Sequence, residues 1–542
     1  MTAPLTDNLP LLAGAPNGIK KLRELILELA VRGKLVPQDP SDEPASELLK
    51  RIAEEKARLV AEGKIKKQKP LAEIGEEEKP FNVPTNWKWV RVAAVGHDWG
   101  QKTPDKSFTY IDVGAVDNAA GKISTPQVLM AEGAPSRARK VVQPGTVIYS
   151  TIRPYLLNVA VIDEAYEQEP IASTAFAIIH PYLEMPARYF LCYLRSPVFV
   201  RYVESVQMGI AYPAINDGQF FSGLVPLPPL AEQHRIVAKV DELMALCDRL
   251  EAQQADAESA HAQLVQASLG SLTQAADAED FAASWQRLAE HFYTLFTTES
   301  SIDALKQTLL QLAVMGQLVP NTHEHTISNH QTESEQYKHP GLEFKVPMHW
   351  SIKKLEQLSQ SIVDCPHSTP KWTETGAICV RTSQFKAGRL DLSSSKYVSE
   401  DTYVERTHRL EPKENDILYS REGGILGIAC RIPQGARLCL GQRMMLIRAN
   451  SEVLPEFVEM TLNSPLITSI ARNKTTGGAA PRVNVSVVKA YPIPLPPLAE
   501  QHRIVAKVDQ LMTLCDQLKA RLTKARQHNE QLATALVEQA VA

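Results

Sequence analysis

Two stretches of the chain place mostly apolar residues at alternating steps of four and three positions. The C-terminal stretch carries the longer series, which is Ile504, Val508, Leu511, Cys515, Leu518, Leu522, Ala525, Asn529, Leu532 and Leu536. The earlier stretch carries Ile236, Val240, Leu243, Cys247 and Leu250 before Ala, Gln and His take over. This spacing is that of a coiled-coil seam, and it outlasts a typical globular helix. It predicts two helices of roughly 35 to 40 residues, about 55 to 60 Å long, that pack against each other. Two helices in two separate cores are the alternative.

Each of these helical patterns follows the same proline-rich sequence. Pro226–Asp241 reads PLPPLAEQHRIVAKVD, and Pro494–Asp509 repeats all sixteen residues at an offset of 268. Prolines at three of the first four positions favour an extended approach and end any preceding helix. A repeat of this length indicates that one structural unit occurs twice in the chain.

Three shorter repeats accompany the long one. They are an amphipathic helix that ends near Gly33, a tryptophan-containing entry sequence and a loop of the form G-x-A-x-P-x-[IV]-N. Their copies are Ile19–Pro37 with Ile302–Pro320, Phe81–Trp87 with Phe344–Trp350, and Gly209–Asn216 with Gly477–Asn484. The offsets of 283, 263 and 268 differ, so the scaffold is duplicated while the segments that it carries have diverged.

Between the repeats, short alternating patterns predict two segments of mixed strands and helices. In residues 81–225 the expected strands are Trp89–Val95, Tyr110–Val116, Thr146–Thr151, Asn158–Ile162 and Ser173–His180, followed by a helix over 187–205. In residues 344–493 they are Ala377–Gln384, Asp416–Ser420, Gly427–Ile432 and Leu438–Arg448, followed by a helix over 455–473. The predicted fold class is therefore mixed α/β, with two α/β domains separated by long helices. The expected boundaries are 1–80, 81–225, 226–343, 344–493 and 494–542.

Composition favours a globular protein over a membrane-spanning or secreted one. The hydrophobic fraction of 44% and the charged fraction of 22% are typical of globular proteins, and no apolar run is long enough for a membrane span. The N-terminus does not resemble a secretory signal, and none of the seven cysteines forms a C-x-x-C motif, so reduced thiols in the cytoplasm are expected. Although the net charge is −4, residues 344–493 contain 20 Lys and Arg against 14 Asp and Glu. This local surplus is compatible with phosphate binding.

No catalytic motif emerges from the sequence. Gly96–Thr103 lacks the spacing of a phosphate-binding loop, and there is no G-x-G-x-x-G, H-E-x-x-H or G-x-S-x-G motif. Four histidines in Asn321–Pro340 have no evident scaffold for a metal ion, and the basic run over 64–69 is expected to be solvated or to touch DNA. We therefore predict no catalytic residue and no metal ligand.

Taken together, the doubled PLPPLAEQ helix, the tryptophan entries and the G-x-A-x-P-x-[IV]-N loops resemble the specificity (S) subunits of type I restriction–modification systems over nearly the whole chain. The resemblance implies two target-recognition domains, at 81–225 and 344–493, held apart by an antiparallel coiled coil. It implies that each domain reads one half of a split, asymmetric double-stranded DNA target. It also implies partners: two modification (M) subunits that carry S-adenosylmethionine, and restriction (R) subunits that use ATP and Mg²⁺. No cofactor is expected on this chain itself. A rod of about 55 Å is long enough to hold two readers on neighbouring major grooves, which are about 34 Å apart.

Candidate DNA contacts are polar and cationic side chains at strand ends and in the repeated loops. Arg153 and Arg421 lead the set, since both follow a Tyr-Ser strand end; a structural salt bridge is the alternative for each. The remaining candidates, each of which is alternatively a solvated surface residue, are Arg381, Ser383, Gln384, Lys474, Thr475, Arg482, Asn484, Lys102, Lys106, Tyr212 and Asn216. Two rival functions stay open: a fused methyltransferase or nuclease, and a coiled-coil scaffold that does not read DNA.

Overall fold

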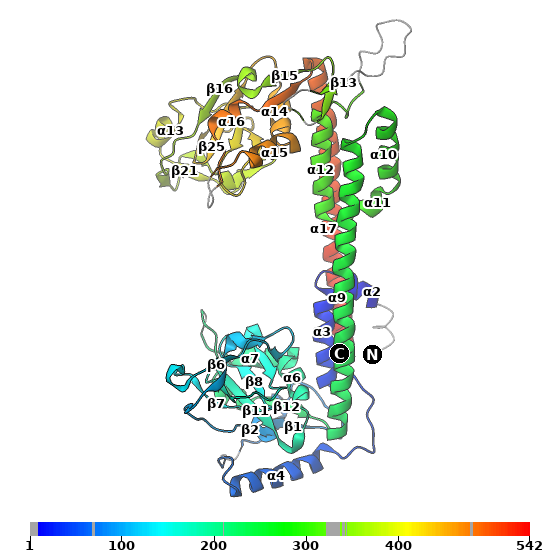
Figure 1. Cartoon of the computed structure of the whole chain (residues 1–542), viewed down its shortest axis with the longest axis vertical. Helices are drawn as coiled ribbons and strands as arrows, with labels where there is room; N and C mark the ends of the chain where they lie inside the picture. The colour runs from blue at the N-terminus through cyan, green and yellow to red at the C-terminus, as the bar shows by residue number, and fades with distance from the viewer. Residues whose placement is uncertain are drawn as a thin grey trace. The chain divides into compact units, whose positions relative to one another are not determined.

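The computed structural model describes residues 9–67, 71–209, 211–320, 336–338, 342, 344–476 and 481–541, and it divides into two compact units (Figure 1). Unit 1 comprises Met1–Asp256 with Arg526–Ala542, and unit 2 comprises Ala257–Ala525. Each unit contains one α/β domain and parts of the long helices. The histidines that the sequence left without a scaffold (His323, His325, His330 and His339), together with Lys69 of the basic run, lie outside the described residues.

The α/β domain of unit 1 is built on two four-stranded sheets, with strand orders β2-β11-β8-β9 and β6-β3-β10-β7. The strands of unit 1 are β1 Lys88–Arg91, β2 Gly96–His97, β3 Phe108–Ile111, β4 Val116–Asp117, β5 Lys122–Ile123, β6 Gln127–Leu129, β7 Ala138–Val141, β8 Val147–Ser150, β9 Val159–Val161, β10 Glu169–Ser173, β11 Phe176–Pro181 and β12 Leu224–Leu227. Its shorter helices are α2 Leu9–Gly14, α3 Gly18–Val31, α4 Ala45–Ala61, α5 Val92–Val95, α6 Ala187–Arg195, α7 Pro197–Val206 and α8 Asp217–Ser222.

The α/β domain of unit 2 likewise contains two four-stranded sheets, ordered β16-β25-β22-β23 and β17-β21-β18-β24. The strands are β13 Gln336–Lys338, β14 Lys345–Pro347, β15 Ser351–Lys354, β16 Ser359–Asp364, β17 Trp372–Thr373, β18 Ala377–Val380, β19 Phe385–Lys386, β20 Arg389–Leu390, β21 Lys396–Val398, β22 Ile417–Ser420, β23 Ala429–Arg431, β24 Leu438–Leu440, β25 Met444–Ala449 and β26 Pro492–Leu495. The shorter helices are α10 Ala278–Glu290, α11 Phe292–Leu295, α12 Glu299–Val314, α13 Glu400–Thr407, α14 Pro455–Leu462, α15 Pro465–Asn473 and α16 Val485–Lys489.

Two long helices, α9 (Leu230–Thr273) and α17 (Leu498–Val541), follow the prolines, and each has 44 residues. In unit 1 the first part of α9 and the last part of α17 share one apolar core with α3. In unit 2 the last part of α9 and the first part of α17 share a core with α12. Within each unit, therefore, opposite ends of the two helices meet, as an antiparallel coiled coil requires. Cys247 and Cys515 lie buried in these cores as small apolar residues.

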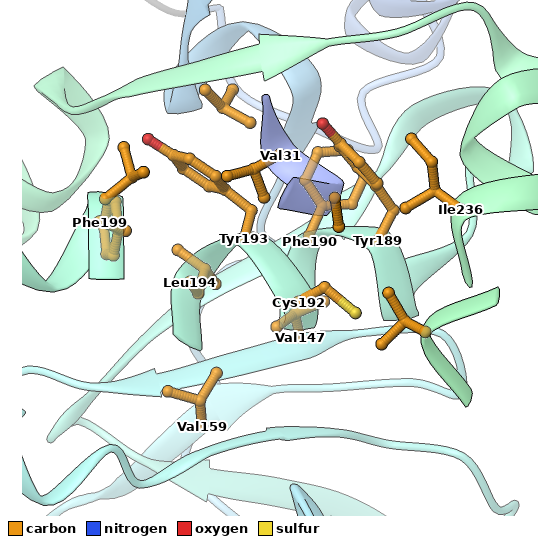
Figure 2. Packing of buried hydrophobic residues seen from close by; sticks show 14 of the residues in the cluster. Val31, Val147, Val159, Tyr189, Phe190, Cys192, Tyr193, Leu194, Phe199 and Ile236 are labelled. Atoms are coloured by element: carbon orange, nitrogen blue, oxygen red, sulfur yellow. The ribbon is translucent and has the colours of Figure 1, made fainter. Parts of the chain in front are cut away.

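The same apolar core extends from the helices into the first sheet. Figure 2 shows Val31 of α3, Val147 of β8 and Ile236 of α9 around the aromatic residues of α6. The hydroxyl of Tyr189 donates a hydrogen bond to the Pro226 carbonyl at 2.6 Å, so a buried aromatic side chain anchors the extended proline segment. One face of the first sheet and the helices of unit 1 consequently share a core, while the rest of the domain packs in two further clusters.

A buried joint connects each α/β domain to the start of the long helix that leaves it. The Trp87 indole donates a hydrogen bond to the carboxylate of Glu232 at 2.8 Å, and Trp350 donates to Glu500 at 3.2 Å. Both glutamates are buried, and burial raises the pKa of Glu232 although the bonds from Trp87 and Gln38 oppose that effect. The joint explains why the tryptophan entry and the LAEQ motif are repeated together.

The strand that enters each domain pairs with the strand that leaves it. β1 pairs with β12 from Lys88 opposite Leu227, and β15 pairs with β26 from Ser351 opposite Leu495, both antiparallel. Proline has no amide hydrogen to donate, and it occurs once in β12 (Pro226) and twice in β26 (Pro492 and Pro494), so each exit strand stays in a short two-stranded ribbon. The ends of each α/β domain therefore lie side by side at the joint.

The structure shortens several predicted elements. The helices expected over 187–205 and 455–473 each break in two, at Pro197 and Pro465, because the residue before a proline avoids helical geometry. The expected strand Leu438–Arg448 also divides at Gly441, where a Cβ would lie 2.2 Å from the Val380 carbonyl oxygen. Its halves, β24 and β25, belong to different sheets.

The strands that were predicted too long end where local hydrogen bonds compete with the sheet. Asp112 accepts a bond from the Val113 amide at 2.7 Å, which starts a 3₁₀ turn inside the expected strand Tyr110–Val116. The expected strand Trp89–Val95 passes into α5 after Arg91, and the expected strand Ala377–Gln384 ends at Val380.

Gly33 and Gly316 provide a test of the joint. Both adopt left-handed backbone angles, with φ of 71° and 72°, and a Cβ at either would lie 2.6 Å from the Cγ of Pro84 or Pro347. Replacement of either glycine by alanine should destabilise its unit by about 2 to 4 kcal/mol, the sum of backbone strain and overpacking. Denaturant unfolding of the variants measures this loss.

Gly63→Ala is the matched control, because Gly63 has φ of 69° but no atom within 4 Å of its Cβ position. It should cost only about 1 kcal/mol. Equal losses at Gly33 and Gly63 would contradict close packing at the joint.

Candidate nucleic-acid interface

In both α/β domains, the loop after a central strand hydrogen-bonds to the G-x-A-x-P-x-[IV]-N loop. In unit 1 the amide of Arg153 donates to the Pro213 carbonyl at 2.8 Å, and the amide of Ile215 donates to the Thr151 carbonyl at 2.9 Å. We call residues 151–157 and 208–216, of which 210 is outside the described part, the first loop pair. Two loops that the sequence suggested separately thus form one surface.

The same two bonds recur in unit 2. The amide of Gly423 donates to the Pro481 carbonyl at 2.9 Å, and the amide of Val483 donates to the Arg421 carbonyl at 2.9 Å. We call residues 421–427 and 474–484, of which 477–480 are outside the described part, the second loop pair. Since the backbone bonds match while the side chains differ, the two loop pairs are versions of one element.

Arg153 lies exposed on the first loop pair. It adopts a left-handed conformation, with φ of 48°, and its guanidinium carbon lies 5.1 Å from the ring centroid of Tyr212. Among the described residues it forms no ion pair, so the salt-bridge alternative is not realised there. The contact between the Arg153 guanidinium and the Tyr212 ring leaves the edge of the guanidinium and the exposed ring available to a ligand.

Arg421 has the opposite environment. Its guanidinium is buried and donates two hydrogen bonds to the carboxylate of Asp364, both 2.8 Å long, and it also pairs with Glu422 at 3.1 Å. Burial disfavours its charge, but the bonds from Asp364 and the nearby carboxylates outweigh burial and raise the pKa of Arg421. The structural ion pair that the sequence left open as the alternative for Arg421 is therefore formed, and it ties the start of the second loop pair to Asp364.

Gln384 is also committed within the fold. Its side-chain oxygen accepts from the Arg381 amide at 2.8 Å, and its side-chain nitrogen donates to the Asp391 carbonyl at 3.3 Å. Gln384 is also buried, so both polar atoms of its side chain serve hydrogen bonds within the fold. Arg381 is half-buried and donates to the Ser394 carbonyl at 3.2 Å, whereas Ser383 is exposed.

Four candidates lie on or beside the second loop pair. Lys474, Arg482 and Asn484 are exposed, and the backbone of Arg482 bridges Thr476 on one side and Glu422 on the other. Thr475 is half-buried and its hydroxyl donates to the Arg472 carbonyl at 2.8 Å. Three side chains of this group thus remain free to meet an anionic ligand.

Of the remaining candidates in unit 1, two have side chains that bind partners within the fold and one has an exposed side chain. Lys102 pairs with Glu169 at 2.7 Å and with Asp105 at 3.1 Å, and these hydrogen bonds raise the pKa of Lys102. Asn216 caps α8 by accepting from the Gln219 amide at 2.9 Å, so its side chain also serves the fold. Lys106, by contrast, is exposed.

A group of titratable aromatic side chains lines a cavity of about 450 Å³ in unit 1. His97 is buried, and neither of its ring nitrogens has a hydrogen-bond partner among the described residues. Burial, reinforced by His97, lowers the pKa of His180 to about 4, so this imidazole is neutral at pH 7. A neutral His180 accepts or donates one bond with Thr146 at 3.1 Å and packs against Trp99.

Comparison with known proteins assigns the family. The model for the "Type I restriction modification DNA specificity domain" matches twice, over residues 84–258 and 349–525. The chain is 34% identical to the EcoAI specificity subunit and 32% identical to the EcoEI specificity subunit, both of type I restriction enzymes of Escherichia coli. Each alignment covers 97% of this chain and 94% of the relative.

The chain belongs to the type I DNA specificity family.

Each matched region contains one α/β domain, its loop pair and the first part of the long helix that follows. The two α/β domains are therefore specificity domains, and the chain is a DNA-recognition (S) subunit. A solved chain described under complex assembly and conformational transition of the type I restriction–modification system supports the fold, at 24% identity and a TM-score of 0.56. That alignment covers 85% of this chain and 99% of the solved one.

Two negative findings apply to the described residues. No group of three or more His, Cys, Asp or Glu side chains is placed there to hold a metal ion. Nor does any helix among them combine the length and the apolar character needed to cross a lipid bilayer.

Sequence reasoning missed the apolar side chains of the first loop pair. Ile152, Tyr155, Leu156 and Met208 are all exposed, although they are large and hydrophobic. The sequence contained a usable signal, since Ile152 directly precedes Arg153 and the pair Tyr155-Leu156 follows Pro154 in the short gap between two expected strands. A search restricted to polar groups passed over it.

The contrast between the two arginines predicts opposite outcomes for their replacement. Arg421→Ala should destabilise unit 2 by about 2 to 4 kcal/mol, because Asp364 is left partly buried without its partner. Arg153→Ala should change stability by less than about 0.5 kcal/mol, since its side chain is exposed. Urea unfolding of both variants checks this; similar losses for the two would show that Arg421 is not structural.

The low pKa of His180 predicts a pH-dependent stability. The unfolded state binds a proton near pH 6.5, whereas the folded state does so only near pH 4. Stability from this group is thus complete above pH 6.5 and is lost as the pH falls toward 4, by about 1 to 3 kcal/mol. Unfolding midpoints of His180→Gln should fall less between pH 7 and pH 4.5 than those of the unaltered protein. His234→Gln, which changes an exposed histidine of the same unit, should behave like the unaltered protein.

Proposed function

We propose that this chain reads a split, asymmetric DNA target, with one half of the target recognised by each specificity domain. One observation carries the proposal: the same pair of backbone hydrogen bonds presents a different set of exposed side chains in each domain. Identical surfaces would read two equal half-sites, whereas different surfaces fit unequal ones.

The proposed contacts are the candidates that remain free of structural roles. In the first domain these are Arg153, Tyr212 and Lys106, and in the second they are Ser383, Lys474, Arg482 and Asn484. Guanidinium and amide groups suit base edges, while lysine suits phosphates. Arg421, Gln384, Lys102 and Asn216 act instead as supports, and Arg381 and Thr475 are secondary candidates because backbone carbonyls engage them.

The long helices α9 and α17 are proposed to set how many base pairs separate the half-sites. The antiparallel packing seen within each unit supports this proposal, because paired helices resist bending better than single ones. The expected domain limits of 81–225 and 344–493 place the two readers on either side of α9 in the sequence.

The chain is proposed to be non-catalytic by itself and to act in a cytoplasmic complex. The family implies two M subunits that carry S-adenosylmethionine and R subunits that use ATP and Mg²⁺. The duplicated helices and joints support two equivalent docking surfaces, since a repeated scaffold presents the same face twice. No cofactor is assigned to this chain.

Methylation mapping tests the proposal. Co-expression of this chain with its M partner in a host that lacks other methyltransferases should methylate one split motif, detected by single-molecule sequencing. Arg482→Ala should relax one half of the motif by about 1 to 3 kcal/mol of discrimination and leave the other half intact. Arg437→Ala is the control, because this exposed arginine pairs with Glu400 away from the loop pair.

Methylation that persists at the same sites without this chain would overturn the proposal. Relaxation of both halves by Arg482→Ala would show that the two domains do not read separately.

A further inference from the structure

We propose that the first specificity domain recognises its half-site with an apolar wedge, which enters the DNA and separates two stacked base pairs. The wedge consists of Tyr155 and Leu156, and Met208 and Tyr212 are exposed on the other loop of the same pair. This inference rests on the proposed function, since it assumes that the first loop pair faces DNA, and it adds a mode of reading that no candidate contact provides.

The first observation is an exposed cluster of large hydrophobic side chains. In the first loop pair Tyr155 is 52% exposed, Leu156 41%, Met208 62% and Tyr212 71%. In the second loop pair none of the described residues is a large exposed hydrophobic. Apolar groups gathered in this way on one surface mark an interaction site, and their restriction to one of two matching loop pairs shows that the scaffold itself does not require them.

The second observation is that the backbone beneath the wedge is rigid and strained. Arg153 and Leu157 flank the 3₁₀ turn Pro154–Leu156, and both adopt left-handed angles, with φ of 48° and 51°. Non-glycine residues hold such angles only where neighbouring contacts enforce them, and these positions concentrate at functional sites.

Hydrogen bonds supply that enforcement. The amide of Leu156 donates to the Arg153 carbonyl at 3.0 Å, and the side-chain nitrogen of Asn118 donates to the Leu156 carbonyl at 3.0 Å. Pro154 is buried and anchors the turn from below. Tyr155 and Leu156 therefore project from a fixed turn, and little conformational freedom is lost when they enter a ligand.

The third observation identifies DNA as the occupant. The exposed guanidinium of Arg153 lies directly before the wedge and has no ion-pair partner among the described residues, so a cation accompanies the apolar tip. Proteins that unstack DNA combine apolar side chains between base steps with arginine or lysine on the backbone or groove. The wedge also belongs to the same loop pair as the proposed base contacts.

A wedge selects sequence through the cost of deforming the DNA. Pyrimidine–purine steps such as TA and CA/TG unstack most easily. We infer that the half-site of the first domain contains such a step beneath Tyr155 and Leu156. The second domain, which presents Lys474, Arg482 and Asn484 instead, is expected to leave its half-site stacked.

Fluorescence of 2-aminopurine tests the wedge in the complex of this chain with its M partner. Duplexes that carry the mapped motif receive one 2-aminopurine at successive positions, except at the methylated adenines, because methyltransferases extrude their target base. Binding should raise the fluorescence severalfold at one step of one half-site, and that half should be the one not relaxed by Arg482→Ala. No position in the other half should respond.

Variants of the wedge should abolish the signal. Tyr155→Ala and Leu156→Ala should each weaken specific binding about tenfold and reduce the fluorescence rise, and the double variant should remove it. Tyr155→Phe and Leu156→Met should retain it. Val404→Ala and Tyr293→Ala are controls, because these residues are comparably exposed but lie outside both loop pairs.

The outcomes separate this inference from the proposed function. Sequence-selective binding with no unstacking in the first half-site, or with unstacking that survives the double variant, overturns the wedge and leaves the proposed function intact. Protection of Tyr155 and Leu156 by the M partner without DNA, measured by hydrogen exchange of the turn, also overturns it by assigning the patch to protein docking. A complex that binds without sequence preference overturns the proposed function itself.

Discussion

Each half of this protein depends on one buried hydrogen bond between an indole and a carboxylate. Trp87 with Glu232, and Trp350 with Glu500, tie the first residues of a specificity domain to the first turn of the helix that leaves it. A buried carboxylate without a partner is costly, so the bond restricts the geometry to one arrangement. The left-handed Gly33 and Gly316 allow a proline ring to close over each joint. The joint therefore fixes how each specificity domain is attached to its long helix.

Although the joints are alike, the two domains differ in the side chains that their loop pairs expose. The backbone bonds between the loops are the same, yet the first loop pair carries aromatic and aliphatic side chains around Arg153, and the second carries cationic and amide side chains. Arg421 belongs to the shared support and not to the exposed set, because its buried guanidinium donates its hydrogen bonds to Asp364. The two surfaces therefore differ through side chains on a shared backbone, not through different folds.

The sequence was sufficient for the scaffold and insufficient for the site, and the reason is the range of the interactions involved. The helices α9 and α17 could be predicted because apolar residues recur at regular spacing within a single continuous stretch. The proline exits and tryptophan entries could be recognised because each occurs twice. The roles of Arg153 and Arg421 could not be separated in this way, because both follow a Tyr-Ser strand end. What distinguishes them is Asp364, which lies 57 residues before Arg421 and reaches it only because β16 pairs with β25 and β25 pairs with β22. Gln384 differs, because its bond to the Arg381 amide is local and depends on where the strand ends: β18 stops at Val380, before the end expected from the sequence.

The adjacency of the entry and exit strands has a consequence for how this protein changes over generations. Because β1 pairs with β12 and β15 with β26, each specificity domain is attached at a single place and can be replaced without threading the rest of the chain. The sixteen residues that lead into and begin both long helices are identical, so the same sequence follows either domain. A specificity domain exchanged at these positions would meet the same joint residues, so its replacement leaves the long helices and the other domain unchanged.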